Sequence, residues 1–60
     1  MKWSELKRIA IQNGWYLVRQ GGNHEIYNHP TKSGNLIMGR HNSEEVKNGT
    51  AAKILKQINN

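Results

Sequence analysis

Two adjacent glycines, Gly21 and Gly22, separate two short runs that are rich in aromatic and β-branched residues. Such a glycine pair is typical of a tight β-hairpin turn, because glycine adopts the positive φ angles that these turns require. The sequence therefore predicts a hairpin with one strand over residues 15–20 and a second over 24–27. This hairpin constrains the remaining chain, because helices on either side of it must pack against the sheet that it begins.

His24, the first residue of the second predicted strand, is the candidate catalytic residue. It lies two residues after Gly22, next to a turn whose glycines have no side chain to block a ligand. With a turn of two or four residues, Arg19 lies directly across from His24 and the two side chains share a face. A cation beside an imidazole that titrates near neutrality is suited to chemistry on a phosphate. The alternative is that His24 is only a polar residue at a strand end.

Length and composition limit the class of protein. Sixty residues make one domain, residues 1–60, with a small core. The chain has no cysteine, so disulfides and thiolate metal sites are excluded, and this composition suits a reducing cytoplasm. No apolar run approaches the length of a membrane span, and the first residues lack the apolar core of a signal peptide. We therefore expect a cytoplasmic protein that does not associate with membranes.

The charge balance indicates a polyanion as partner. The chain has nine Lys and Arg residues but only four Glu residues, which gives a net charge of +5 and a pI of about 10.0. The basic residues are spread along the chain, which predicts a folded, charged surface and not a disordered tail. Nucleic acid is the expected partner and an acidic protein the second choice. The alternative is a small protein that its lysines merely keep soluble.

A helix is expected over residues 4–13, with Ser4 as its N-cap and Asn13 and Gly14 closing it. Its apolar side chains fall on one stripe of the helical wheel, as in a helix that faces a core: Trp3, Leu6, Ile9 and Ala10. Ile11 falls outside this stripe and is either a partner contact or an isolated exposed residue.

The last helix is expected to begin at Thr50 as its N-cap. Lys53 and Lys56 lie three residues apart, opposite an apolar stripe formed by Ala51, Ile54, Leu55 and Ile58. At this spacing the two lysines can bind a phosphate backbone together. They are equally consistent with a solvated helix face.

A third strand is predicted over residues 36–39, after a proline-containing connection over 28–35. Residues 40–43 follow this strand, and the polar run over 44–49 is expected to be an ordered loop. Both faces of the hairpin are partly apolar. We expect the face with Trp15, Leu17 and Ile26 to lie under the helices, with Arg19 and His24 at its rim. The fold class is then α+β, in the order α-β-β-β-α. A three-stranded antiparallel sheet with both helices on one face is the arrangement of the double-stranded RNA-binding domain, which by itself says nothing about activity.

The sequence resembles the HicA (YcfA-like) toxins, the RNA-cleaving halves of bacterial toxin-antitoxin pairs, over nearly its whole length. Members typically carry Gly-Ser-His-His at the turn, and the first histidine is catalytic; this role falls on His24, while Asn23 and Glu25 replace the serine and the second histidine. The resemblance rests on these segments in this order: residues 13–19, 22–24, 27–30, His41, 47–50 and 54–57. It implies a domain that cleaves mRNA and blocks translation, and a HicB-type antitoxin, expected to be acidic, that covers the active site.

Two functions follow from these observations: an endoribonuclease toxin that uses His24, and a non-catalytic RNA-binding module with the same fold. The candidate phosphate-binding residues are Arg19, Gly22, Asn23, Lys53 and Lys56. We expect cleavage to be metal-independent, because the sequence has no carboxylate cluster to hold Mg²⁺. The proton donor is left open among Tyr27, His29, His41 and water. A zinc site of His24, His29 and His41 is a weaker alternative.

Overall fold

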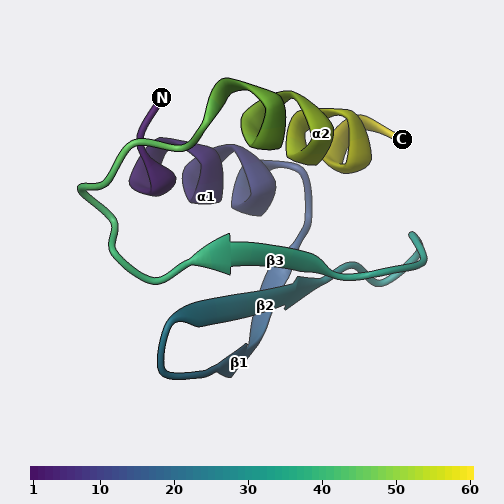
Figure 1. The fold of residues 1–60 in the computed structure, drawn as a ribbon. Coiled ribbons are helices and arrows are strands. Elements are labelled where there is room, and N and C mark those ends of the chain that lie inside the picture. Colours follow the sequence, from purple (N-terminus) through teal and green to yellow (C-terminus); the bar gives the residue numbers. More distant parts are fainter.

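The computed structural model describes residues 1–60. Helix α1 (Trp3–Gln12) is followed by strands β1 (Tyr16–Gln20), β2 (His24–Asn28) and β3 (Leu36–Gly39) and by helix α2 (Asn48–Asn59). The strands form one antiparallel sheet in the order β1-β2-β3, and both helices lie on the same side of it (Figure 1). The expected α+β class and element order are confirmed. Neither helix has the length and apolar character that crossing a membrane requires.

The helices cover the opposite face of β2 from the one that we expected. Glu25 and Tyr27 are buried on the side of the sheet that carries the helices. Side chains alternate along a strand, so Ile26 and His24 lie on the other side. Ile37, which pairs with Ile26, is 59% exposed. The expectation fails for Ile26, because a glutamate is buried on β2 in place of an apolar residue and its cationic partner lies on a distant segment. It holds for Trp15, which is buried in the core, and for Leu17, which pairs with Tyr27 on the helix side.

An irregularity in β1 also changes the position of Arg19. Leu17 pairs with Tyr27, but the register shifts between Leu17 and Arg19, and Arg19 pairs with Ile26. The prediction that Arg19 lies directly across from His24 is therefore wrong. Because Ile26 and His24 are two residues apart on one strand, Arg19 and His24 still share a face, as diagonal neighbours.

Distant backbone carbonyls cap the start of α1. The amide of Trp3 donates to the carbonyl of Glu44, and the amide of Ser4 donates to that of Asn42, each at 3.1 Å. Ser4 is thus inside the helix, and Lys2 occupies the N-cap position without a side-chain hydrogen bond. The same kind of shift occurs in α2, where Lys47 and not Thr50 is the N-cap residue.

The loop after β3 is ordered by the N-terminus of the chain. The buried Val46 donates its amide to the carbonyl of Met1 at 2.9 Å, and Lys2 forms an isolated β-bridge with Glu45. The core joins this loop to both helices and to the sheet through ten buried side chains: Leu6, Ala10, Trp15, Tyr27, Leu36, Met38, Val46, Ala51, Ile54 and Ile58. No helix covers β1, and all five of its residues are exposed.

Candidate functional site

The β1–β2 turn presents uncovered backbone next to His24. The amide of Gly21 donates to the carbonyl of His24 at 2.8 Å, which leaves Gly22 and Asn23 at the tip. Neither Gly21 nor Gly22 has a positive φ, so the reason we gave for the glycines is wrong. A Cβ atom on Gly22 would have no atom within 4 Å. The turn geometry therefore does not require glycine at Gly22, and the effect of this residue is to leave the peptide backbone accessible.

Arg40 holds this turn from the end of β3. Its amide donates to the carbonyl of Asn23 and its guanidinium Nη1 donates to the carbonyl of Gly22, both at 3.1 Å. Arg40 was not among the predicted site residues, because no local sequence pattern links it to a turn 18 positions earlier. Arg40 fixes the backbone that precedes His24. In addition to Arg19, it is the second cation at this end of the sheet.

The face of the sheet away from the helices, which we call the open face, carries His24 among polar, aromatic and aliphatic side chains. By pairing and alternation, its members are Tyr16, Arg19, His24, Ile26, Asn28 and Ile37. Arg19 and His24 are exposed and make no side-chain hydrogen bond or ion pair within the chain. None of the four glutamates is on this face: Glu5 is in α1, Glu25 faces the helices, and Glu44 and Glu45 follow β3. The open face is therefore a positively charged surface.

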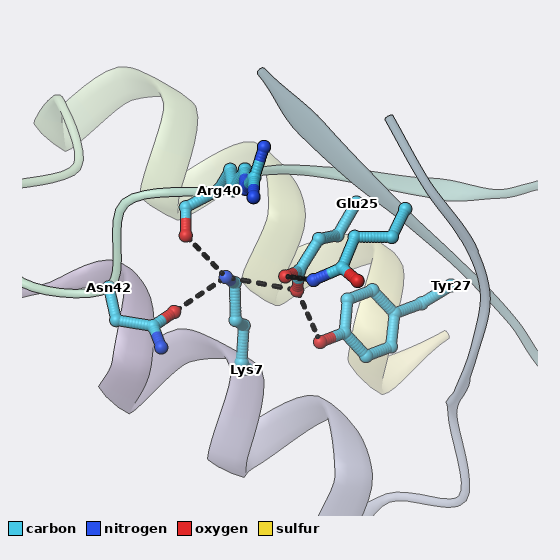
Figure 2. A network of polar contacts seen from close by, with 6 residues as sticks. Lys7, Glu25, Tyr27, Arg40 and Asn42 are labelled. Carbon is cyan, nitrogen blue, oxygen red and sulfur yellow. Dashed lines mark hydrogen bonds and ion pairs between the residues drawn. The ribbon is translucent and has the colours of Figure 1, made fainter. Parts of the chain in front are cut away.

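Directly behind His24, the side chain of Glu25 is fixed by a buried ion pair. Lys7 reaches from α1 toward β2, and its Nζ lies 3.0 Å from Oε1 of Glu25 (Figure 2). The same ammonium donates to Oδ1 of Asn42 at 2.6 Å and to the carbonyl of Arg40 at 3.4 Å. Lys7 and Glu25 are only 6% and 8% exposed. This network joins α1, β2 and the segment that holds the turn.

Two further donors complete the coordination of the Glu25 carboxylate. The hydroxyl of Tyr27 donates to Oε1 and the side-chain amide of Gln20 donates to Oε2, each at 3.0 Å. Burial acts to raise the pKa of Glu25, but the hydrogen bonds from Lys7, Tyr27 and Gln20 outweigh it, so that the pKa lies below its usual value. Glu25 is thus held as a carboxylate and has no proton to supply.

Tyr27 is unsuited to donate a proton to a leaving group at His24. Its burial, together with its hydrogen bond to the Glu25 carboxylate, raises its pKa to about 12. Its side chain is on the helix side of the sheet, whereas His24 is on the open face. Tyr27 is therefore part of the network that supports β2.

His29 has a structural role in the connection after β2. Its Nδ1 accepts hydrogen bonds from the amides of Thr31 and Lys32, so its Nε2 carries the hydrogen that is donated to the carbonyl of Asn13 at 2.9 Å. The ring also packs edge-on against Trp15 at 5.2 Å between centroids. With both nitrogens engaged, His29 is not free to bind a metal, and the chain contains no cluster of three His or Glu side chains placed to hold one.

The remaining candidate residues are His41, Lys53 and Lys56, and they differ in how close they lie to the open face. His41 is exposed, two residues after Gly39, which pairs with His24. Lys53 lines a hollow of about 330 Å³ between α2 and the edge of β3, together with Ile37. Lys56 is exposed on α2 but does not line this hollow. The structure therefore brings Lys53 to the border of the open face and leaves Lys56 outside it.

The family model for the HicA toxin of bacterial toxin-antitoxin systems matches residues 3–59. The chain belongs to the HicA toxin family. It is thus a toxin whose partner is an antitoxin. No curated protein matches the sequence.

In this HicA toxin, Glu25 follows His24 and has a structural role, because its carboxylate belongs to the buried network with Lys7. Glu25 stands where the resemblance implied a second histidine, and its carboxylate is directed away from the open face into the network with Lys7. The candidate site therefore has one imidazole on β2, and an ion pair lies on the opposite side of the strand.

Proposed function

We propose that the protein is an endoribonuclease toxin that cleaves mRNA in the cytoplasm and thereby blocks translation, with His24 as its catalytic residue. The observation that carries this proposal is the placement of His24. It is exposed next to the exposed turn residues Gly22 and Asn23, with Arg19 on the same face and Arg40 bound to the turn carbonyls. Membership of the HicA toxin family supports the toxin part of the proposal.

The proposed reaction uses the ribose itself as nucleophile. His24, as a neutral imidazole, takes the proton of the 2′-hydroxyl, and the 2′-oxygen attacks the adjacent phosphorus. The bond from phosphorus to the 5′-oxygen then breaks, and this oxygen takes a proton. The products are a 2′,3′-cyclic phosphate and a 5′-hydroxyl. Because Tyr27 and His29 are engaged elsewhere, the proton comes from His41 or from water.

Positive charge at the turn serves the transition state. Negative charge grows on the phosphate oxygens during the attack, and a preorganised donor that meets it contributes roughly 10² to 10³ in rate. Arg40, fixed by its bond to Gly22, and Arg19, diagonal to His24, are placed at this end of the sheet. We propose that the reaction needs no metal ion, because His24 can act as the base and Arg19 and Arg40 can supply the positive charge.

The test compares wild-type protein with His24→Gln on an RNA substrate. We expect the variant to lose cleavage and to relieve growth arrest on expression, while its thermal unfolding stays unchanged, because an exposed imidazole contributes little to packing. His41→Gln should lower the rate if His41 is the proton donor and leave it unchanged if water is. A folded His24→Gln variant with full activity would contradict the proposal.

Two conditions test the chemistry. EDTA should leave the rate unchanged, and a substrate with 2′-deoxyribose at the scissile position should stay intact, because it lacks the nucleophile. Cleavage of that substrate, or a loss with EDTA that Mg²⁺ restores, contradicts the mechanism. If wild-type protein binds RNA but cleaves none, the protein is a non-catalytic RNA-binding module.

We further propose that the antitoxin is of the HicB type, is acidic, and covers His24 and the positively charged open face. Like-signed surfaces repel and opposite ones attract, so a net charge of +5 favours an acidic contact surface. Hydrogen exchange of the complex should show protection of the turn amides at Gly22 to His24. Exchange that is unchanged at the turn in a formed complex would contradict this placement.

A further inference from the structure

The open face combines the types of side chain that bind unpaired nucleotides. Tyr16 is 48% exposed, and it pairs with Asn28, next to the half-buried Ile26. Ile37, on β3, extends this surface with an aliphatic side chain. Aromatic rings in a positively charged groove hold single strands because every base has a π-face on which the ring can stack. A half-exposed tyrosine on a β-sheet surface offers such a ring.

The spacing from Tyr16 to His24 suits a short stretch of extended RNA. Asn28, opposite Tyr16, lies four residues from His24 along β2, which corresponds to about 13 Å at the usual rise of a strand. A few nucleotides bridge this distance. Arg19 pairs with Ile26, midway between the two positions, where its unpaired guanidinium can meet the connecting phosphate.

Charge and ring exposure favour RNA over a protein and a single strand over a duplex. The open face has no glutamate, and Arg19 and Lys53 stand on it and at its border. A duplex buries the faces of its bases in the helical stack, so Tyr16 could contact only backbone there. The element order alone matches a double-stranded RNA-binding domain and would favour a duplex. The side chains on the open face, which the element order does not describe, favour a single strand instead.

We propose that the open face is a binding track for single-stranded RNA that leads to His24, with Tyr16 as a base-stacking residue and Arg19 as a phosphate contact. This inference rests on the proposed function, because it names the form of RNA that the same site receives. The protein binds unpaired segments of RNA and places the bond to be cut at the β1–β2 turn.

The test measures binding of a fluorescent single-stranded RNA of about ten nucleotides, in which 2′-O-methyl groups prevent the proposed cleavage. Tyr16→Ala should weaken binding roughly tenfold, since one stacked base is worth about 1–3 kcal/mol. Tyr16→Phe keeps the ring and should bind within about twofold of wild type. The same RNA annealed to its complement should bind more weakly than the single strand.

Leu17→Ala is the matched control. Leu17 follows Tyr16, is 46% exposed and pairs with Tyr27 on the helix side, so its loss should not change RNA binding. If Tyr16→Ala and Leu17→Ala bind the RNA equally well, or if the protein prefers the annealed duplex, the proposed binding track for single-stranded RNA is contradicted. If Tyr16→Ala weakens only the complex with the antitoxin, the open face binds protein and the inference is also overturned.

A second measurement avoids any effect of substitution on folding. Wild-type protein irradiated with RNA that carries 4-thiouridine should form a cross-link at Tyr16, and cross-links confined to α1 and α2 would contradict the track. The two proposals fail separately. His24-dependent cleavage with no effect of Tyr16→Ala removes the track alone, and binding that depends on Tyr16 without cleavage removes the catalytic role alone.

Discussion

At the scale of single residues, Lys7 and Glu25 decide which face of β2 is inside. A buried carboxylate is tolerated only when it is paired and hydrogen-bonded. Glu25 has an ion pair with Lys7 and accepts from Tyr27 and Gln20. With Glu25 satisfied on the helix side, His24 is placed on the open face by alternation along the strand.

We expect Lys7→Met to destabilise the protein by about 3 kcal/mol, because it leaves the Glu25 carboxylate buried without its cation. The stability of a 60-residue domain is roughly 3–9 kcal/mol in total, so this loss should shift the urea midpoint strongly. Arg8→Met is the control. Arg8 follows Lys7, is exposed, and its side chain makes no hydrogen bond within the chain, so its replacement should change stability by less than about 0.5 kcal/mol. Equal stability of the two variants would refute this account.

The same carboxylate predicts a pH dependence. The folded state lowers the pKa of Glu25 below its ordinary value of 4.5, so the unfolded chain takes up a proton at higher pH than the folded protein does. The stabilisation from Glu25 is therefore complete above that value and is lost as the pH falls through the folded pKa. Urea midpoints should decline as the pH falls below 4.5, and Glu25→Gln should flatten this decline. An unchanged slope in Glu25→Gln would show that Glu25 is not responsible.

At the scale of elements, the turn from α1 to β1 depends on Gly14. Its φ is +91°, and a Cβ atom there would lie 2.8 Å from Nε2 of His29, which donates to the carbonyl of Asn13. The helix end, the start of β1 and the connection after β2 therefore meet at one glycine. This is the position in the chain where a positive φ and a close contact coincide.

We expect Gly14→Ala to cost at least about 1 kcal/mol, because an L-residue is strained at this φ and the methyl group displaces His29. Gly49→Ala is the contrasting substitution. Gly49 lies in the first turn of α2 with nothing within 4 Å of a Cβ atom, so alanine should stabilise the helix by up to about 1 kcal/mol. Thermal unfolding should move in opposite directions for the two variants. A Gly14→Ala protein as stable as wild type would contradict the role of this contact.

At the scale of the whole molecule, positive charge is divided between folding and binding. Lys7 is in the buried pair, Lys32 donates to the carbonyl of Ile58 at 2.6 Å, and Arg40 holds the turn. Arg19, Lys53 and other basic residues make no side-chain hydrogen bond within the chain. These unpaired cations are the ones that can neutralise phosphates.

RNA affinity should therefore fall with salt. Each phosphate neutralised on a single strand contributes about −0.7 to the slope of log K against log salt concentration. Arg19→Gln should make the slope shallower by about this amount. Arg8→Gln, a change on α1 and not on the sheet, should leave it unchanged. A flat response of the wild-type protein from low to moderate salt would indicate that RNA is not the ligand.

The sequence by itself determined the elements and their order, and it pointed to the hairpin as the candidate site. The signals were local: glycine between β-rich runs, apolar periodicity in both helices, and a glycine after α1. Each depends on residues within a few positions of one another, so it is present in the sequence before any folding. The family segments are short as well, although they are spread over most of the chain, and the family that they indicated is the one that matches.

Only the tertiary structure decided which face of the sheet is buried, what caps α1 and what holds the turn. Lys7 and Glu25 are 18 positions apart, and Arg40 and Gly22 are equally distant. In the sequence Glu25 looks like a solvent-facing residue, because burying a charge is unfavourable until a partner is brought to it. The partner arrives only when α1 packs on the sheet. For the same reason the cap of α1, supplied by carbonyls of the loop after β3, has no signal in the residues of the helix itself.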